Sequence, residues 1–197
     1  MYYLGIDKES VMFDYEDYYR FIAKQVPDKC RICEVGVANA KSAIALAEFI
    51  LEQGKTIERF VLVDNLDYGK QKQLQTIMTH LSKSGVAQFA EFYPMSSLDA
   101  SCEFPDGYFH FIFLDSSHTY EQTKAEIRLW VRKVMDDGIL AGHDASMADV
   151  EQAVNEVLPR FYQDGEDLKH CLKVVPTALE HNIWEFNKNW RTIKEVK

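Results

Sequence analysis

The sequence predicts an α/β fold in which helices cover both faces of one mostly parallel sheet. Four short apolar runs each end on a carboxylate, at residues 31–34, 60–64, 111–115 and 139–144. Helix-period segments separate these runs, and right-handed crossovers then bring all four strand ends to one edge of the sheet. The length of 197 residues suits one well-buried core. We therefore expect four acids to share a cleft at the edge where open α/β sheets bind ligands.

Apolar spacing and turn residues predict the elements of the N-terminal part of the chain. In order, these are a helix over 9–26, a strand over 31–34, a helix over 42–52, a strand over 60–64, a helix with apolar positions across 74–81, and strands over 88–93 and 111–115. Gly54 and Gly85 are natural stops for the second and third helices.

The C-terminal part begins with a helix signal at residues 119–122. Thr119 and Gln122 have the form of a capping box, in which the Thr hydroxyl and the Gln side chain satisfy free backbone N–H groups. The apolar stripe of this helix includes Ile127 and Trp130, and the helix is expected to end at Gly138. A further helix over 147–161 should break at Pro159. Runs at 172–175 and 182–186 suit an antiparallel pair at the edge of the sheet.

Together these elements predict a single Rossmann-like domain with a mostly parallel seven-stranded sheet, an antiparallel edge strand and helices on both faces. Residues 1–29 form an N-terminal helical cap, residues 30–186 the Rossmann-like core and residues 187–197 a solvated tail. Tyr15, Tyr18 and Tyr19 could form a lid over an acceptor, but packing against the sheet explains them as well and is favoured.

The composition limits the range of partners. The formal net charge is −9, and lysines and arginines are scattered singly, so we expect no nucleic acid partner. The chain start lacks a secretory pattern and no apolar run is long enough for a bilayer, which predicts no membrane partner and a cytoplasmic location. The four cysteines are then expected to be reduced. The sequence leaves a homo-oligomer open.

The turn after the first strand, residues 34–42, indicates the kind of ligand. It holds only one glycine, Gly36, whereas a dinucleotide fingerprint needs three and a P-loop needs a Gly-Lys-Ser or Gly-Lys-Thr element. Glu34 would repel a phosphate and attract an ammonium group. Asp64, at the end of the second strand, can accept both hydroxyls of a ribose. S-adenosylmethionine combines a ribose, an ammonium and a sulfonium, so these features point to it by charge.

Two segments carry a resemblance to a known family. Residues 114–121, Leu-Asp-Ser-Ser-His-Thr-Tyr-Glu, resemble an Asp-Gly-x-His-x-Tyr-Glu signature, and residues 138–144 resemble a Gly-Gly-x-x-x-x-Asp element. Over about residues 30–145 the chain resembles class I S-adenosylmethionine-dependent methyltransferases. Its central part is similar to the small bacterial group related to sugar and natural-product O-methyltransferases. The resemblance implies an enzyme that transfers a methyl group to an oxygen of a small-molecule acceptor of sugar or natural-product type.

The resemblance also implies the binding site of the cofactor. It places Glu34 and Gly36 by the methionine moiety, Asp64 at the ribose, Ser96 or Ser97 near the adenine and Asp115 near the transferring methyl, with Ser42 and Asn65 completing the set. Two departures from the family pattern bear on this site. Ala40 stands where the family usually has a second glycine, and Ser116 replaces the glycine of the signature.

Asp115, His118 and Asp144 are the candidate catalytic residues. Metal-dependent relatives hold Mg²⁺ at positions that Asp115, His143 and Asp144 match, although imidazole is a poor ligand for this hard ion, so a site without metal is favoured. In that case the facing carboxylates of Asp115 and Asp144 would raise the pKa of one of them. His118 is the candidate general base, because a neutral imidazole can take the proton of an attacking hydroxyl.

Two other function classes remain open at this point. One is an NAD(P)-dependent oxidoreductase on a similar sheet, which the missing glycine triplet disfavours, and the other is a non-catalytic nucleoside-binding domain. A Ser-His-Asp hydrolase built from Ser116 or Ser117, His118 and Asp115 is discounted, because the sequence contains no Gly-x-Ser-x-Gly elbow.

Overall fold

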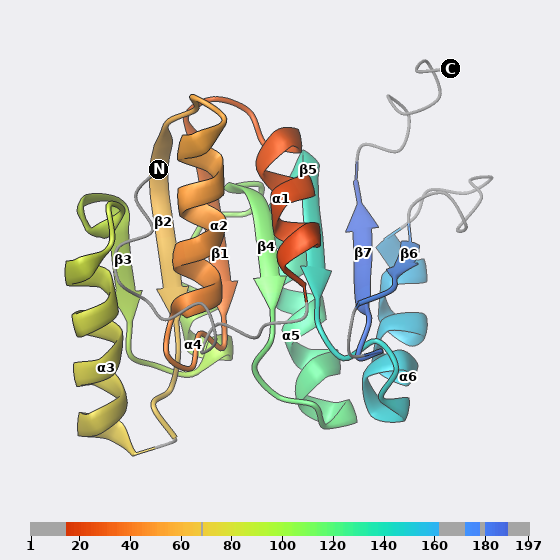
Figure 1. Ribbon diagram of the computed structural model, residues 1–197. Helices are drawn as coiled ribbons and strands as arrows, with labels where there is room; N and C mark the ends of the chain where they lie inside the picture. Colours follow the sequence, from red (N-terminus) through yellow and green to blue (C-terminus); the bar gives the residue numbers. More distant parts are fainter. Residues whose placement is uncertain (1–14, 68, 162–171, 178–179, 189–197) are drawn as a thin grey trace.

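The computed structural model describes residues 15–67, 69–161, 172–177 and 180–188, and within them one seven-stranded sheet has the order β3-β2-β1-β4-β5-β7-β6 (Figure 1). The strands are β1 (Cys30–Val35), β2 (Ile57–Val63), β3 (Ala90–Tyr93), β4 (Phe109–Leu114), β5 (Val134–Gly142), β6 (Leu172–Val175) and β7 (Ile183–Asn187). Strands β1 to β5 pair in parallel, whereas β7 is antiparallel to both β5 and β6. The predicted α/β fold with an antiparallel edge is confirmed.

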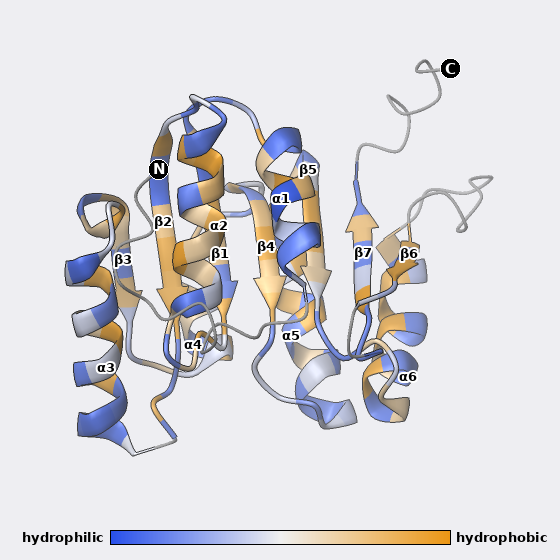
Figure 2. Ribbon diagram, in the orientation of Figure 1, coloured by the Kyte–Doolittle hydropathy of each residue, from blue (hydrophilic) through white to orange (hydrophobic). Residues whose placement is uncertain are grey.

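Helices cover both faces of this sheet. They are α1 (Glu16–Gln25), α2 (Lys41–Glu52), α3 (Lys70–Lys83), α4 (Ser97–Ser101), α5 (Tyr120–Lys133) and α6 (Ala148–Val157), with short 3-10 turns at Ala87–Phe89 and Leu158–Phe161. Residues of α1, α2 and α3 share one hydrophobic cluster, and those of α4, α5 and α6 share the other. Figure 2 shows the apolar strands between the mixed surfaces of these helices.

Alternation along the strands decides which cluster each side chain joins. In β1, Ile32 packs into the cluster of α1 to α3, whereas Cys33 and Val35 pack into the cluster of α4 to α6. Successive side chains of a strand point to opposite faces, so Glu34 shares the side of Ile32. This alternation later determines which of the strand-end acids reach the ligand cavity.

Helix α5 and strand β5 differ in part from the predicted elements. The helix begins after Thr119 as expected, but no side-chain hydrogen bond caps it. The Thr119 hydroxyl contacts Ser117 Oγ at 3.3 Å, and the Gln122 amide donates to Ser97 and Glu126. It also ends at Lys133, and Val134 already pairs with Phe109 as part of β5. The predicted break near Pro159 is confirmed, because Leu158–Phe161 forms a 3-10 turn.

Some expectations lie outside the described residues. Residues 9–14 of the predicted N-terminal helix and residues 189–197 of the predicted tail are among them, whereas the rest of that helix is present as α1. The division into cap, core and tail therefore stays a prediction. In the described part of the chain, no helix has both the length and the apolar character needed to cross a membrane.

We expect Gly142→Ala to destabilise the fold, because Gly142 packs tightly against residues of β4 and β7. A Cβ atom there would lie 2.7 Å from the Leu114 carbonyl oxygen and would overlap the Trp184 ring. Overpacking of this kind costs about 1–3 kcal/mol, to be measured by urea unfolding. Gly85→Ala is the matched control, since its added Cβ meets no atom within 4 Å. Equal stability of both variants would contradict the close packing of β5.

Candidate active site

A cavity of about 770 Å³ opens at the carboxyl ends of the parallel strands. Its size is typical of a pocket for a small organic ligand. It is lined by Val35, Gly36 and Ala38 after β1, Val63, Asp64, Asn65 and Asp67 after β2, Ser96, Ser97 and Leu98 at α4, Asp115, Ser116, Ser117, His118 and Thr119 after β4, and Gln122 and Glu126 on α5. The cavity lies at the predicted edge of the sheet.

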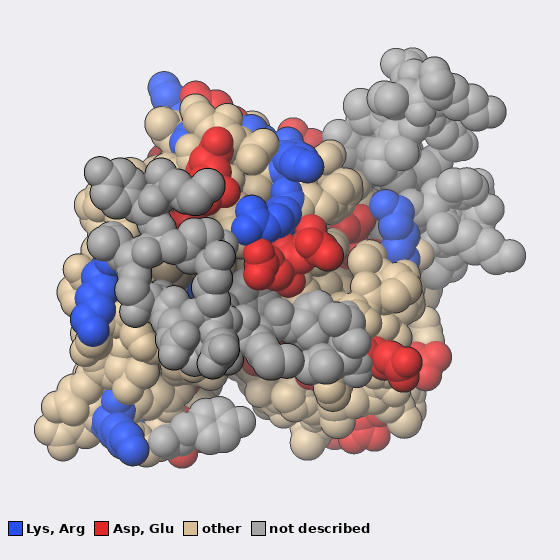
Figure 3. Space-filling model, viewed as in Figure 1, with Lys and Arg blue, Asp and Glu red and all other residues tan. Residues whose placement is uncertain are grey.

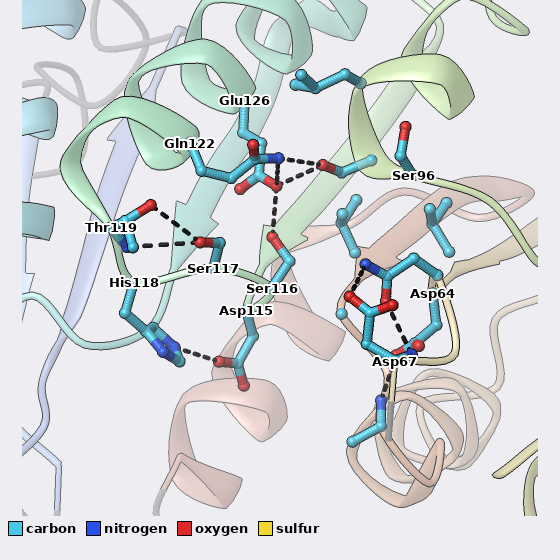
Figure 4. A pocket seen from close by; sticks show the side chains of 17 residues that line it. Asp64, Asp67, Ser96, Asp115, Ser116, Ser117, His118, Thr119, Gln122 and Glu126 are labelled. Atoms are coloured by element: carbon cyan, nitrogen blue, oxygen red, sulfur yellow. Dashed lines mark hydrogen bonds and ion pairs between the residues drawn. The ribbon is translucent and has the colours of Figure 1, made fainter. Parts of the chain in front are cut away.

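Figure 4 shows three polar corners in this cavity. Asp64 and Asp67 form one, Asp115 and His118 form the second, and Gln122 and Glu126 form the third. The strand-end acids therefore do not all meet in a single cluster, and each corner has its own charge and hydrogen-bonding character.

The loop after β1 forms a wall of the cavity and has an unusual backbone. Gly36, Ala38 and Ala40 all have positive φ, at 86°, 47° and 62°. A Cβ on Gly36 would overlap the Asp115 carbonyl oxygen and lie 2.6 Å from the Ser116 Cα, so only glycine fits there. Ala40, which stands in place of a second glycine, adopts the left-handed conformation as the N-cap of α2 and is fully buried.

Asp64 joins the loops after β1 and β2. Its Oδ2 accepts from the Ala38 N–H at 2.9 Å, and its Oδ1 accepts from the Leu66 N–H at 2.7 Å and from Gln73 Nε2 at 3.0 Å. Its side chain lines the cavity, and so does exposed Asp67, which accepts from Asn65 Nδ2 at 2.7 Å. Asp67 adds a second carboxylate to the corner predicted for a ribose.

Glu34 and Ser42 are not among the residues that line the cavity. Glu34 is buried on the α1 side of β1, where it accepts from Ser42 Oγ at 2.5 Å and from the Tyr19 hydroxyl at 2.7 Å. Burial raises the pKa of its carboxyl to about 7. The role of these two residues in holding the methionine moiety stays a prediction, and strand alternation explains why they lie behind the wall.

Asp115, His118 and Asp144 come together at the second corner. His118 Nε2 lies 2.8 Å from Asp144 Oδ2 and 3.6 Å from Asp115 Oδ1, and no described atom meets this nitrogen with hydrogen-bond geometry. The carboxylates of Asp115 and Asp144 raise the pKa of His118 to about 10. The two acids thus stabilise the charged form of this imidazole at pH 7, whereas a neutral imidazole was expected.

The histidines also change the expected titration of the two acids. Burial alone would raise the pKa of Asp144, but the imidazoles of His118 and His143 outweigh it and hold this pKa below its usual value. Asp144 is therefore not the carboxyl whose pKa the facing pair raises, because imidazoles lie beside it. His181 Nδ1 lies 3.3 Å from Asp144 Oδ1 and adds a third imidazole.

The atoms that could bind a metal differ from the predicted set. Ligand atoms of Asp115, His118 and Asp144 lie within 4.8 Å of one another, whereas His143 Nδ1 contacts Asp144 Oδ2 at 3.0 Å and lies 3.9 Å from Asp115. Two carboxylates with imidazole nitrogens suit a first-row transition metal better than Mg²⁺, which prefers oxygen ligands. The donor set therefore does not fit Mg²⁺, the ion that metal-dependent relatives hold at the matching positions.

The two predicted serines have different surroundings at α4. Ser96 caps this helix, where its Oγ accepts from the Asp99 N–H at 3.1 Å and donates to Asp99 Oδ2 at 2.7 Å. Ser97 is buried and donates to Glu126 Oε1. Both line the cavity, and their contact with an adenine stays a prediction.

Sequence reasoning missed several residues at this site. Glu126 had a detectable signal, because an acid three positions after Thr123 falls on the buried stripe of the predicted α5 helix. Tyr15 was considered as a lid residue or, preferably, as packed against the sheet, and it is buried there. The hydrogen bond from its hydroxyl to Asp115 Oδ2 at 3.1 Å and the contact of His181 with Asp144 gave no signal, since the partners are remote in sequence.

Comparison with known families decides the class of this site. A model described as a methyltransferase domain matches residues 33–145, more than half of the chain. The chain belongs to this methyltransferase family. The match spans the loop after β1, the Asp115–His118 segment and the His143–Asp144 pair. No curated protein matches the sequence.

Solved structures with the same fold include other methyltransferases. The tRNA methyltransferase TrmI from Aquifex aeolicus has a TM-score of 0.63 at 15% identity, with 93% of this chain and 72% of that chain covered. An rRNA methylase from Streptococcus thermophilus has a TM-score of 0.63 at 13% identity, covering 90% and 97%. The Streptococcus mutans protein SMU.1697c, assigned as a methyltransferase and solved with S-adenosylhomocysteine, has a TM-score of 0.63 at 9% identity, covering 90% and 98%.

The expectation of no nucleic acid partner is wrong. It rested on the net charge, yet structures of the same fold include proteins named as tRNA and rRNA methylases. Net charge describes the whole molecule, whereas a partner responds to the local potential around a cleft. Figure 3 shows that acidic and basic side chains are interspersed on one face, so the total of −9 does not describe each part of the surface.

We expect the stability of the protein to fall between about pH 4.5 and pH 7 because of Glu34. The pKa of this carboxyl is about 7 in the fold against 4.5 for the free side chain, so the folded state binds more protons across this window. Ionisation then costs up to about 3 kcal/mol by pH 7 and above. Glu34→Gln should remove this slope in urea unfolding measured at several pH values.

Glu151→Gln is the control for this experiment, since Glu151 is an exposed acid on α6. Its stability should follow the wild-type pH dependence. If Glu34→Gln kept the wild-type slope, the buried carboxyl would not be the group that titrates.

Proposed function

We propose that this methyltransferase transfers a methyl group from S-adenosylmethionine to a hydroxyl oxygen of its acceptor, with His118 as the proton acceptor. The observation that carries the proposal is the position of His118 Nε2, held at the cavity 2.8 Å from Asp144 and 3.6 Å from Asp115. Transfer to oxygen requires a group that removes the hydroxyl proton, and an imidazole between two carboxylates can accept and then hold that proton.

The residues of the cavity fit a cationic nucleoside. Asp64 and Asp67 offer carboxylate oxygens for ribose hydroxyls, and Asp115 offers negative charge at a separate corner. The volume of about 770 Å³ is sufficient for a nucleoside with an amino acid chain. Contact with the cofactor at Gly36, Asp64, Asn65, Ser96, Ser97 and Asp115 is proposed on this basis. S-adenosylmethionine, when bound, supplies a methyl group already activated by its sulfonium.

The protein then has two tasks, which are to align the acceptor and to remove its proton. The Tyr15 hydroxyl donates to Asp115 Oδ2 at 3.1 Å and orients this carboxylate. Asp115 and Asp144 favour the protonated form of His118. A second cation beside Asp115 would share this carboxylate and lower the pKa of His118. The neutral imidazole can then accept the hydroxyl proton, and Asp144 stabilises the resulting imidazolium.

The acceptor is proposed by its reacting atom. A hydroxyl of a sugar or natural product fits the O-methyltransferase resemblance, and RNA hydroxyls enter the same screen because structural neighbours include RNA methylases. The alternative of an NAD(P)-dependent oxidoreductase loses support, because the family match covers the site and the loop after β1 holds only one glycine. A non-catalytic nucleoside-binding domain is distinguished by the experiments below.

Binding of the cofactor product is the first test. We expect S-adenosylhomocysteine to bind with micromolar or better affinity in isothermal titration, and S-adenosylmethionine to yield methyl ether products in an acceptor screen analysed by mass spectrometry. The screen runs with EDTA and again with Mg²⁺, since the donor set does not favour magnesium. Failure to bind either nucleoside, beside a known methyltransferase as positive control, would overturn the proposal.

The pH dependence of methyl transfer tests the role of His118. A group with a pKa of about 10 is charged at pH 7 and cannot accept a proton, so the rate should rise with pH, about tenfold per unit below the pKa in the working complex. His118→Ala should lower the rate 10²- to 10⁴-fold and abolish this rise. Its affinity for S-adenosylhomocysteine should change less than about threefold.

His80→Ala is the matched control, because His80 lies on α3 outside the cavity and contacts the Asn39 carbonyl oxygen. It should keep the wild-type rate and pH profile. A pH-independent rate in the wild type, or a rise that persists in His118→Ala, would assign the proton to another group. Methyl transfer to nitrogen or carbon as the sole product would contradict the oxygen acceptor.

A further inference from the structure

The third corner of the cavity is built around a buried carboxylate. Glu126 on α5 is only 2% exposed, yet it lines the cavity. Its Oε1 accepts from Ser116 Oγ at 2.6 Å, from Gln122 Nε2 at 3.0 Å and from Ser97 Oγ. All of these donors reach the same oxygen, as Figure 4 shows for the group around Glu126.

The other carboxylate oxygen, Oε2, has no hydrogen-bond partner among the described residues. Among the described residues, His118 Nε2 is the one side-chain nitrogen or oxygen that is both fully buried and without a partner. Glu126 Oε2 also has no partner, so it is not fully buried and stays accessible. An unsatisfied acceptor on a charged and nearly buried group costs free energy that a donor on a ligand would recover. We therefore expect Glu126 Oε2 to accept a hydrogen bond from an N–H or O–H group of a ligand.

The side chains around Glu126 already use their hydrogen-bond donors within the protein. The two amide hydrogens of Gln122 point to Ser97 Oγ at 3.2 Å and to Glu126 Oε1, which leaves the amide carbonyl as an acceptor. The hydroxyl hydrogens of Ser97 and Ser116 are used on Glu126. The corner thus offers acceptors to a ligand, and a carbonyl oxygen placed there would be repelled.

We propose that Glu126 recognises the exocyclic amino group of the adenine of the methyl donor, an inference that rests on the proposed function. The corner with Asp64 and Asp67 suits the ribose hydroxyls, and the corner with Asp115 suits the positively charged part of the methyl donor. The corner with Gln122 and Glu126 is then the one that remains for the adenine base. An adenine amino group has two N–H donors for Glu126 Oε2 and the Gln122 carbonyl. Hypoxanthine, which carries a carbonyl oxygen at this position, is excluded by the same groups.

A comparison of two ligands tests this without any variant. Isothermal titration of the wild-type protein should show that S-adenosylhomocysteine binds at least tenfold more tightly than S-inosylhomocysteine, its deaminated analogue, since an unpaired buried acceptor costs about 1–3 kcal/mol. Glu126→Gln should lose at least tenfold in affinity for S-adenosylhomocysteine and bring the preference below threefold, because its amide can donate to the carbonyl of hypoxanthine.

Glu121→Gln is the matched control, since Glu121 is an exposed acid on the same helix and does not line the cavity. It should retain the wild-type preference. Circular dichroism melting checks that Glu126→Gln is folded, and Glu126→Asp replaces it if it is not, again with a reduced preference. A wild type that binds neither ligand would overturn the proposed function itself. Equal binding of both ligands by the wild type, or an unchanged preference in the variant, would overturn only the role of Glu126.

Discussion

Three tyrosine hydroxyls at the start of α1 hold carboxylates on the sheet or at its edge, and much of the architecture follows from this pairing. Tyr19 donates to Glu34 on β1, Tyr15 donates to Asp115 at the end of β4, and Tyr18 donates to Glu185 on β7 at 3.0 Å. A buried carboxylate without donors is strongly unfavourable, so the three contacts fix the position of α1 across strands that are distant in sequence. Burial raises the pKa of each tyrosine above its usual value, and the negative charge of the neighbouring carboxylates raises it further, so the hydroxyls stay donors.

Most of the fold could be predicted because it depends on patterns that are local in sequence. Apolar runs such as 60–63 and 111–114 become central strands, and the spacing of Ile127 and Trp130 places α5 against the sheet. The errors have physical causes. The first half of β5 includes exposed Asp136 and Asp137, which carry no strand signal, and α4 has only five residues, too few for a periodic pattern.

The candidate site was less predictable, because its chemistry depends on contacts between distant segments. The sequence shows the acids at the strand ends. It does not show that Glu34 lies behind the wall of the cavity, or that Asp64 joins two loops. The charge of His118 depends on Asp144, which is 26 positions away and reaches the site only through the pairing of β4 and β5. The packing of the whole molecule determines the contacts of His181 and Tyr15 and leaves one oxygen of Glu126 free. No short sequence motif predicts these features.

The three left-handed residues of the loop after β1 affect how this chain can be recognised among others. Only Gly36 is a glycine, and Ala38 and Ala40 hold the same backbone shape at a cost of roughly 1–2 kcal/mol each. Surrounding contacts, such as the hydrogen bond from the Ala38 N–H to Asp64 and the burial of the Ala40 methyl group, maintain that shape. Searches that count glycines in nucleotide-binding turns would therefore overlook proteins of this kind, whereas comparing backbone torsion angles would find them.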